Sequence, residues 1–374
     1  MAKNFSMKDR LFNAETLGQL GREYEAGLPD LDGQSFSQKA LSGVAERSLM
    51  ECLDWFADCI EPYLADDFLE MADQIRAIMP PPLDPALKDD DFGQFIHAVP
   101  GVLAVRHGLE DHREVALDLL HAATQRFSME FYIRPFLNRW PDETLARLER
   151  WATDENYHVR RLVSEGTRPN LPWARGVDLT LAQTLPLLDL LHADDARFVT
   201  RSVANHLNDV TKKDPDAVLD RLVAWQGLER QIKKELDWMT RHALRTLVKD
   251  GHPAALLQLG YRGDIGVKAN IEIAKNVLKI GETLSFECEL VADEDLPVLV
   301  DYRLRFARPG RKSGEKVFKL KQANAKSGKA IRLTKDHKLK GDATTFRLYP
   351  GPHEITLQVN GVDRATSTFE LIEP

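Results

Sequence analysis

The segment 126–137 places a carboxylate among aromatic side chains. Glu130 is followed directly by Phe131 and Tyr132, and Arg134 lies four residues after it. An ionised carboxylate buried here without a partner would be costly, so Glu130 must either pair with an arginine or face a cleft. An ion pair with Arg134 on one helix face is the simpler interpretation, because side chains four residues apart meet there. The sequence leaves this structural role and a functional role open.

A second segment, 158–173, combines arginine, glutamate and tryptophan. Glu165 lies four residues after Arg161, and a helix that ends at Gly166 would place both in its last turns. A carboxylate at the C-terminal end of a helix opposes the helix dipole, so there must be a reason for its presence. The loop that follows carries Arg168 and Trp173. Trp173 either covers the end of a hydrophobic core, which is the commoner role of a tryptophan, or is presented to a ligand.

A third segment, 201–210, contains several residues that form helices poorly. Asn205, Asn208 and Asp209 lie within five positions, so a function or a capping role must compensate for the lost helix propensity. His206 is more simply a core histidine than a ligand. The chain has neither the HExxH pattern, nor paired Cys and His spacings, nor a Gly-x4-Gly-Lys-Ser/Thr loop, so we expect no metal and no nucleotide cofactor.

Helical repeats are predicted to position these segments. Apolar residues recur at spacings of three and four from about Asp9 to Leu259. The stretch 141–151 is echoed at 215–225, and each copy begins with a proline at a first-turn position. Arg161, Arg201 and Arg241 recur at intervals of 40 residues in the helices that follow. A period near 40 with two helices per unit is typical of HEAT-like repeats, so residues 1–262 are predicted to form an α-solenoid.

The pattern changes to short alternating strands after Gly260. Seven or eight strands in about 108 residues fit an immunoglobulin-like β-sandwich over residues 263–374, although it has neither a Cys pair nor a central Trp. The predicted strands are Val267–Ile273, Thr283–Val291, Val298–Phe306, Val317–Lys321, Ala330–Thr334, Thr344–Leu348, Glu354–Val359 and Ser367–Ile372.

Charge is distributed very unevenly along the 374 residues. The whole chain has a net charge of -8, whereas residues 1–100 have 8 Lys and Arg against 19 Asp and Glu, and residues 308–340 have 12 against 2. A basic segment on an acidic protein suits a polyanion, although a solvated charged surface explains it equally well. The loop with Arg311 and Lys312 at its tip lies in this segment.

Composition excludes several other classes of protein. The chain is 43% hydrophobic and 29% charged, with no apolar run near the roughly 20 residues of a membrane helix and no N-terminal signal pattern. Three cysteines, Cys52, Cys59 and Cys288, are too few for a disulfide framework or a four-ligand zinc site. We therefore expect no membrane partner and a cytoplasmic location.

Short motifs spread over most of the chain carry a family resemblance. They are Lys8–Asn13, Pro80–Pro85, Asp89–Gly93, Arg126–Ser128, Ile133–Leu137, Val159–Leu162, Ser164–Pro169, Ser202–Asp209 and Arg241–Leu247. Together they resemble the AlkC branch of the DNA alkylation-repair proteins, and the predicted sandwich resembles the immunoglobulin-like extension of some of its members.

The resemblance implies a DNA glycosylase that needs no cofactor. Such an enzyme excises cationic 3-methyladenine and 3-methylcytosine from double-stranded DNA without rotating the lesion into a deep pocket, and in bacteria it would associate with the nucleoid when bound to DNA. The catalytic residues that the resemblance implies are Glu130, Glu165, Trp173 and Asp209, with Arg161 in support.

Elementary chemistry agrees with these assignments. A base methylated at N3 is already cationic and leaves as a neutral molecule, so the enzyme must mainly stabilise the oxocarbenium-like sugar and orient water, which carboxylates can do. Trp173 could pack its ring against the cation. Arginines would hold phosphates, which positions the duplex without reading its sequence. The predicted phosphate contacts are Arg134, Arg160, Arg168, Arg201, Arg241, Arg311 and Lys312.

Two other functions fit the same sequence. Most solenoids are interaction platforms, so a non-catalytic HEAT-repeat scaffold for a protein partner is one alternative. A DNA-damage sensor that binds methylated duplex without cleaving it is another. A solenoid that clamps DNA can work as a monomer, and the chain is expected to be one.

Overall fold

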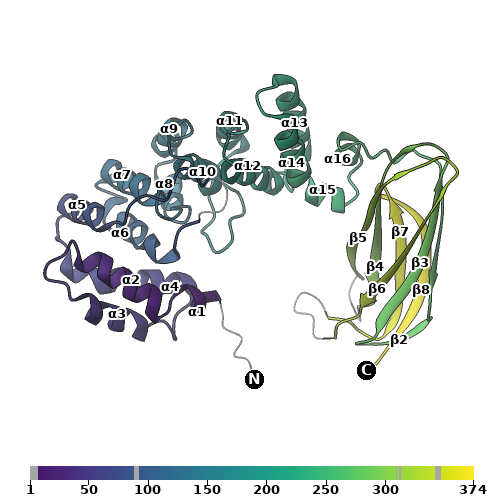
Figure 1. Cartoon of the computed structure of the whole chain (residues 1–374), viewed down its shortest axis with the longest axis horizontal. Coiled ribbons are helices and arrows are strands. Elements are labelled where there is room, and N and C mark those ends of the chain that lie inside the picture. Colours follow the sequence, from purple (N-terminus) through teal and green to yellow (C-terminus); the bar gives the residue numbers. More distant parts are fainter. Residues whose placement is uncertain (1–6, 88–91, 309, 311–312, 342–346) are drawn as a thin grey trace. The chain divides into compact units, whose positions relative to one another are not determined.

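The computed structural model describes residues 7–87, 92–308, 310, 313–341 and 347–374. They divide into two compact units, one within Met1–Lys213 and Ala224–His242, the other within Asp214–Val223 and Ala243–Pro374. Helices precede strands along the chain (Figure 1). The last helix, α16, ends at Gln258 and the first strand begins at Val267. The boundary between residues 262 and 263 falls in this connection, and the division into domains there stays a prediction.

Several of the first helices are capped by a side chain and have one apolar face. Asn13 accepts hydrogen bonds from the N–H groups of Glu15 and Thr16 at the start of α2, and Asp67 caps α5 in the same way. Their apolar faces pack together, so that α2 lies against α3 and α6 against α7. The helices are α1 Met7–Leu11, α2 Ala14–Glu25, α3 Gly33–Ser42, α4 Leu49–Ile60, α5 Phe68–Ile78, α6 Val99–Gly108 and α7 Arg113–Thr124, with short 3-10 turns at Glu61–Tyr63 and Phe95–Ala98.

The predicted repeats are found from α9 onward. Helix α9 packs beside α11, and α10 packs beside α12, so equivalent helices of successive pairs stack on one another. The echoed prolines, Pro141 and Pro215, are the first residues of α9 and α13. The remaining helices are α8 Ile133–Arg139, α9 Pro141–Trp151, α10 Tyr157–Gly166, α11 Leu181–Leu191, α12 Arg197–Val210, α13 Pro215–Leu228, α14 Lys233–Ala243, α15 Arg245–Lys249 and α16 Pro253–Gln258.

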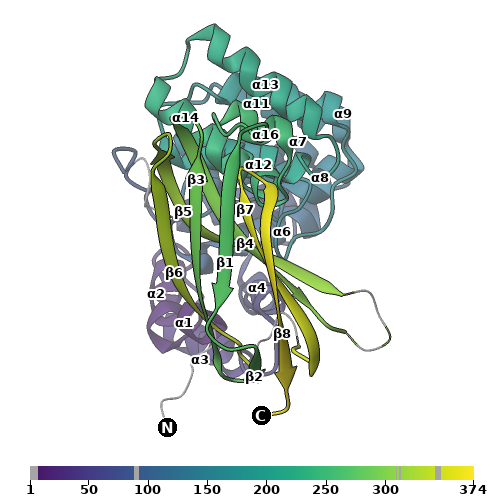
Figure 2. The same ribbon diagram turned by 90° about the vertical axis from the view of Figure 1, so that its right-hand side faces the viewer.

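The strands form two sheets that bury a common core. One sheet has the order β1-β3-β6, and the other has the order β2-β8-β7-β4-β5 (Figure 2). Alternate side chains of β3 and β4, such as Leu284, Phe286 and Tyr302, point into the core. The strands are β1 Val267–Ile273, β2 Val277–Lys279, β3 Thr283–Ala292, β4 Leu296–Phe306, β5 Gly314–Ala325, β6 Ala330–Lys338, β7 Gly351–Val359 and β8 Val362–Ile372.

Most predicted strands are confirmed, with two differences. The three-residue strand β2 was missed, because a segment this short shows no alternation. The predicted strand Thr344–Leu348 falls mostly outside the described residues, and its last two residues, Arg347 and Leu348, are not in a strand.

Candidate active site

Three carboxylates and two arginines form one continuous series of ion pairs, which we call the charge chain. Arg161 Nη1 lies 2.8 Å from Glu130 Oε2, and Arg161 Nη2 lies 3.6 Å from Glu165 Oε2. Arg168 continues the series, with Nη1 2.5 Å from Glu165 Oε1 and Nη2 3.0 Å from Asp209 Oδ2. Each arginine is thus shared between two carboxylates. The structure therefore brings together four of the predicted catalytic residues, and Arg168 joins them.

Helix stacking explains how residues so far apart in sequence meet. Arg161 and Glu165 lie on α10, and Arg168 follows its end by two residues. Asp209 lies near the end of α12, which packs against α10. Glu130 lies in the turn before α8, where it pairs with Arg161, so the expected ion pair with Arg134 does not form.

Glu165 and Asp209 are the most enclosed carboxylates of the charge chain, each with 6% of its side chain exposed. Glu165 has the more closely defined surroundings. Its Oε2 accepts a hydrogen bond from Ser202 Oγ at 2.6 Å, and its Oε1 accepts one from Arg168. Burial raises the pKa of Glu165, but the positive charges of Arg161 and Arg168 and these hydrogen bonds outweigh burial and hold the pKa below 4.5. Glu165 is therefore an anion at neutral pH.

Glu130 differs because one of its oxygens is unoccupied. Oε2 accepts hydrogen bonds from Ser128 Oγ and Arg161 Nη1, each at 2.8 Å. In the part of the chain that the structure describes, Oε1 accepts none, and 15% of the side chain is exposed. A carboxylate with one fixed and one open oxygen can accept a proton from a water molecule or face a developing positive charge.

Arg134 anchors the loop that carries Trp173. Its Nη1 donates to the carbonyl oxygens of Gly166 at 2.9 Å and Arg168 at 3.0 Å, and its Nε donates to the carbonyl of Arg175. The residue is 1% exposed. Burial and the nearby charge of Arg168 lower the pKa of Arg134 to about 10, so it still carries a charge at neutral pH. Its Nε and Nη1 thus donate inside the protein and the residue is almost fully buried, so in this conformation Arg134 holds the loop, and its phosphate contact stays a prediction.

Trp173 is presented to the surface. The residue is 62% exposed, which excludes the alternative that it covers a hydrophobic core. Its φ of 61° lies in the left-handed region, where a residue with a side chain is strained. Strain of this kind persists where the surrounding structure imposes it, and it is concentrated at functional sites.

The other predicted phosphate contacts fall into three groups. Arg160 is bound inside the protein, with Nε 2.5 Å from Asp194 Oδ2 and Nη1 2.8 Å from the carbonyl of Asp154. Arg201 on α12 is half-buried and Arg241 on α14 is exposed. Arg311 and Lys312 lie outside the described residues.

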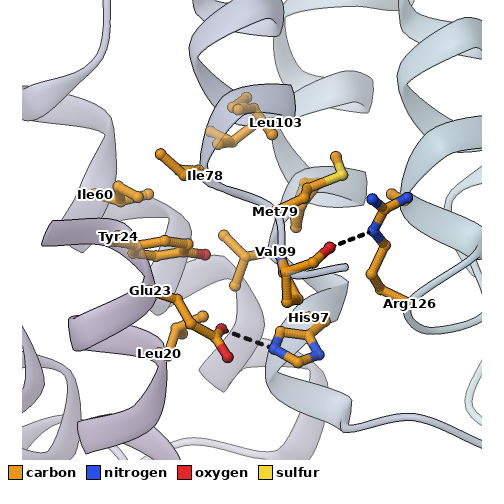
Figure 3. Close-up of a pocket in the computed structure, with 14 residues that line it drawn as sticks. Leu20, Glu23, Tyr24, Ile60, Ile78, Met79, His97, Val99, Leu103 and Arg126 are labelled. Carbon is orange, nitrogen blue, oxygen red and sulfur yellow. Dashed lines mark hydrogen bonds and ion pairs between the residues drawn. The ribbon is translucent and has the colours of Figure 1, made fainter. Parts of the chain in front are cut away.

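A separate apolar pocket lies among the N-terminal helices and shares no residue with the charge chain (Figure 3). Leu20, Ile78 and Leu103 form part of its wall, where His97 Nε2 lies 2.9 Å from Glu23 Oε2. Burial raises the pKa of Glu23, but hydrogen bonds from His97 and Gln19 outweigh burial and lower it. The pocket is thus a packing feature of these helices with one internal ion pair.

Two further features concern the described residues as a whole. None of their helices is both long and apolar enough to cross a membrane. Nor do three or more His, Cys, Asp or Glu side chains among them gather where they could hold a metal ion.

Comparisons with known proteins decide the family. A family model described as DNA alkylation repair enzyme matches residues 127–247, which contain the whole charge chain. The solved structure of Pseudomonas fluorescens alkylpurine DNA glycosylase AlkC, bound to DNA containing an abasic site analog, is 30% identical, has a TM-score of 0.84, and is matched over 98% of this chain and 100% of that chain. The chain belongs to the AlkC/YhaZ family of DNA alkylation-repair proteins.

The AlkC/YhaZ likeness extends to the strands. A model described as the C-terminal Ig-like domain of the uncharacterised protein YhaZ matches residues 267–373. The "Uncharacterized protein YhaZ" of Bacillus subtilis (strain 168) is 28% identical over 370 residues, which are 96% of this chain and 98% of that protein. The family and the fold class that the sequence indicated, helical repeats followed by an immunoglobulin-like domain, are thereby confirmed.

Sequence reasoning missed the roles of the groups that position the charge chain. Ser128 and Ser202 donate to Glu130 and Glu165, and Arg134 fixes the loop. Only Ser202 left a trace in the sequence, since it lies on one helix face with Asp209, and serines are too common for that spacing to stand out.

Proposed function

We propose that this protein is a DNA glycosylase that excises cationic N-alkylated bases, of the 3-methyladenine and 3-methylcytosine type, from duplex DNA by hydrolysis of the N-glycosidic bond. The observation that carries the proposal is the charge chain, together with a surface-exposed, strained tryptophan in the loop that follows Arg168. A scaffold has no need to hold three mostly buried carboxylates in a row, because each costs desolvation. AlkC of Pseudomonas fluorescens, an alkylpurine DNA glycosylase, is similar over nearly the whole chain.

The chemistry asks for negative charge and a positioned water. The bond between C1′ and the base nitrogen breaks with its electron pair going to the base, which thereby loses its positive charge. The deoxyribose becomes oxocarbenium-like, and preorganised anions stabilise it in a poorly solvated site. Water then bonds to C1′ and loses a proton.

The surroundings of the carboxylates support different roles. Glu165 has both oxygens hydrogen-bonded and its pKa lowered, so it suits a fixed anion that stabilises the sugar cation. Glu130 has an open Oε1 and suits the orientation of water. Asp209 holds Arg168, with Lys212 Nζ 3.5 Å from its Oδ1.

Trp173 supports selection for charge. An indole face attracts a cation by roughly 0.5–2 kcal/mol, and a neutral base would gain only the packing. Because Trp173 is 62% exposed, it can meet a lesion that remains near the surface, as expected for excision without base flipping.

The decisive experiment is release of 3-methyladenine from alkylated duplex by the purified protein and by Glu130→Gln and Glu165→Gln. We expect release by the wild type and a loss of at least about 100-fold in both variants, with DNA affinity retained. Glu235→Gln is a matched control, because Glu235 is also buried and bonded to an arginine, Arg197, and to a hydroxyl, that of Thr200. A folded wild type that binds methylated duplex without releasing base would instead be a damage sensor, and one that binds no DNA would be a scaffold.

Phosphate contacts are proposed for Arg201 and Arg241. Changing either to Gln should weaken binding equally on methylated and unmodified duplex and reduce its dependence on salt, since phosphate contacts carry no sequence information. Loss of activity with an unchanged salt dependence would contradict this role.

A further inference from the structure

One face of α12 contacts both α10 and the charge chain along its length. Phe198, Ser202, His206 and Asp209 are spaced by four, four and three residues, which places them on one side of the helix. The guanidinium of Arg161 lies 4.4 Å from the centre of the Phe198 ring. His206 Nδ1 lies 3.1 Å from the carbonyl oxygen of Ser164. This face of α12 is therefore the support on which α10 and its charged side chains rest.

Ser202 is the residue on this face whose hydroxyl contacts the carboxylate of Glu165. Its Oγ lies 2.6 Å from Glu165 Oε2 and 2.9 Å from Ser164 Oγ, and the residue is 2% exposed. A hydroxyl has a single hydrogen, and an ionised carboxylate is a stronger acceptor than another hydroxyl. The shorter bond, to Glu165, thus receives the hydrogen.

The two oxygens of Glu165 depend on different donors. Oε1 is held by Arg168 at 2.5 Å. The arginine nearest to Oε2, Arg161, lies 3.6 Å away, which is beyond a good hydrogen bond. Without Ser202, Oε2 would keep only this long contact in a buried place, where an unsatisfied acceptor is costly. The Glu165 carboxylate would then be held only at Oε1, by its ion pair with Arg168, and Oε2 could change position.

We propose that Ser202 is a positioning residue that fixes the Glu165 carboxylate between Arg161 and Arg168 and so sets its readiness for catalysis. The proposal rests on the proposed function of Glu165 in base excision. Ser202 itself touches neither sugar nor base in this mechanism, and it acts through Glu165. Because its bond to Glu165 favours the ionised carboxyl, removing it must raise the pKa of Glu165 and move the acidic limb of activity to higher pH.

The test compares four variants of the whole protein. Ser202→Ala removes the donor, Ser202→Cys keeps the volume with a weak donor, and Ser202→Thr keeps the hydroxyl. Thr200→Val is the matched control, because the hydroxyl of Thr200 lies on the same helix and donates to another buried glutamate, Glu235, at 2.6 Å. Any general effect of losing a buried hydroxyl-to-carboxylate bond is shared by this control.

Base release should respond only to the Ser202 donor. We expect kcat to fall about tenfold in the Ala and Cys variants with little change in KM, because the lost bond is to a charged group. The acidic limb of kcat should shift upward in these two variants and stay in place in Ser202→Thr and Thr200→Val. Equal losses in Ser202→Ala and Thr200→Val would reduce Ser202 to a packing role.

A second readout does not depend on activity. Carbon-13 NMR of labelled glutamate carboxyls, with the Glu165 signal identified by its absence in Glu165→Gln, reports the pKa directly. The pKa of Glu165 should rise in Ser202→Ala and Ser202→Cys and stay unchanged in Thr200→Val. An unchanged pKa overturns the proposal even if the enzyme is active, whereas a wild type that releases no base overturns the proposed function and leaves the NMR result to decide on Ser202.

Discussion

Trp173 combines exposure with an unfavourable backbone conformation. A residue with a side chain pays about 1 kcal/mol for left-handed φ, whereas glycine does not. We therefore expect Trp173→Gly to be about 1 kcal/mol more stable than Trp173→Ala in urea unfolding, although both lose at least about tenfold in release of cationic bases. Trp173→Phe should retain part of the activity. Equal stability of the Gly and Ala variants would mean that the loop relaxes and stores no strain.

His206 makes stability depend on pH. Burial, together with the positive charge of Arg168, lowers the pKa of His206 to about 4, from 6.5 for the free side chain. Between these values the unfolded chain binds a proton that the folded protein excludes, so the free energy of unfolding falls as the pH drops from about 6.5 to about 4. His206→Gln keeps an amide donor for the Ser164 carbonyl but cannot titrate.

Urea unfolding of wild type and His206→Gln across this range measures the difference. The wild type should lose stability relative to the variant as the pH falls, and the loss should level off near pH 4. If the stability of the two proteins changed in parallel with pH, His206 would have the same pKa in the folded and the unfolded protein, and the prediction would be wrong.

Single residues were predicted from sequence to unequal degrees. Glu165 stood out because its carboxylate opposes a helix dipole, and the structure supplies the reason in Arg161 and Arg168. The partner of Glu130 could not be predicted, since local spacing favoured Arg134 and the actual partner, Arg161, lies 31 residues away. Arg134 looked like a surface cation because burial by a returning loop leaves no local pattern.

At the scale of elements, the loop 167–180 is held by α8. Arg134 binds carbonyls on both sides of Trp173, and Asn138 Nδ2 donates to the carbonyl of Gly176 at 2.9 Å. Arg134→Met should release the loop and cost about 2 kcal/mol or more, because buried carbonyls lose their donor. Arg139→Met is the control, since Arg139 lies on the same helix with 49% of its side chain exposed.

Limited trypsin digestion checks this prediction. Cleavage after the exposed Arg175 should be much faster in Arg134→Met than in wild type or Arg139→Met. Unchanged cleavage together with full activity would mean that Asn138 alone suffices.

The helices were predicted better than their packing. The echo of 141–151 at 215–225 located α9 and α13, because an amphipathic period is a local property. The interval of 40 residues between Arg161 and Arg201 indicated that α10 and α12 are equivalent, stacked helices, but not that their stacking brings Glu165 and Asp209 to the same arginine. A helix was expected at 201–210 despite its poor helix formers, and the side chain of one of them, Asn205, bonds to His242 at 2.8 Å.

At the scale of the whole molecule, negative and positive charges are concentrated in different segments of the chain. The N-terminal helices are acidic, while β5, β6 and the turn between them are rich in lysine. Lys319, Lys321 and Lys329 are exposed. We expect the triple change of these lysines to Gln to weaken DNA binding and to reduce the slope of log K against log salt by about 0.9 for each lysine that contacts a phosphate.

Three lysines of the same unit provide the control. Lys268, Lys275 and Lys279 are exposed on or beside β1 and β2, and their change to Gln alters the net charge equally. Equal effects of the two triple variants would indicate general attraction, and an unchanged slope in the first would exclude β5 from the DNA contact.

The sharing of each arginine between two carboxylates limits how the protein can evolve. Replacing either arginine leaves its two carboxylates with too little positive charge, so most single mutations of Arg161 or Arg168 reduce fitness before the loss of a carboxylate can restore balance. Variation among descendants should then accumulate in pairs at these positions. New lesion preferences would arise first in the exposed loop around Trp173, where a mutation alters what is recognised without disturbing the charges that act on it.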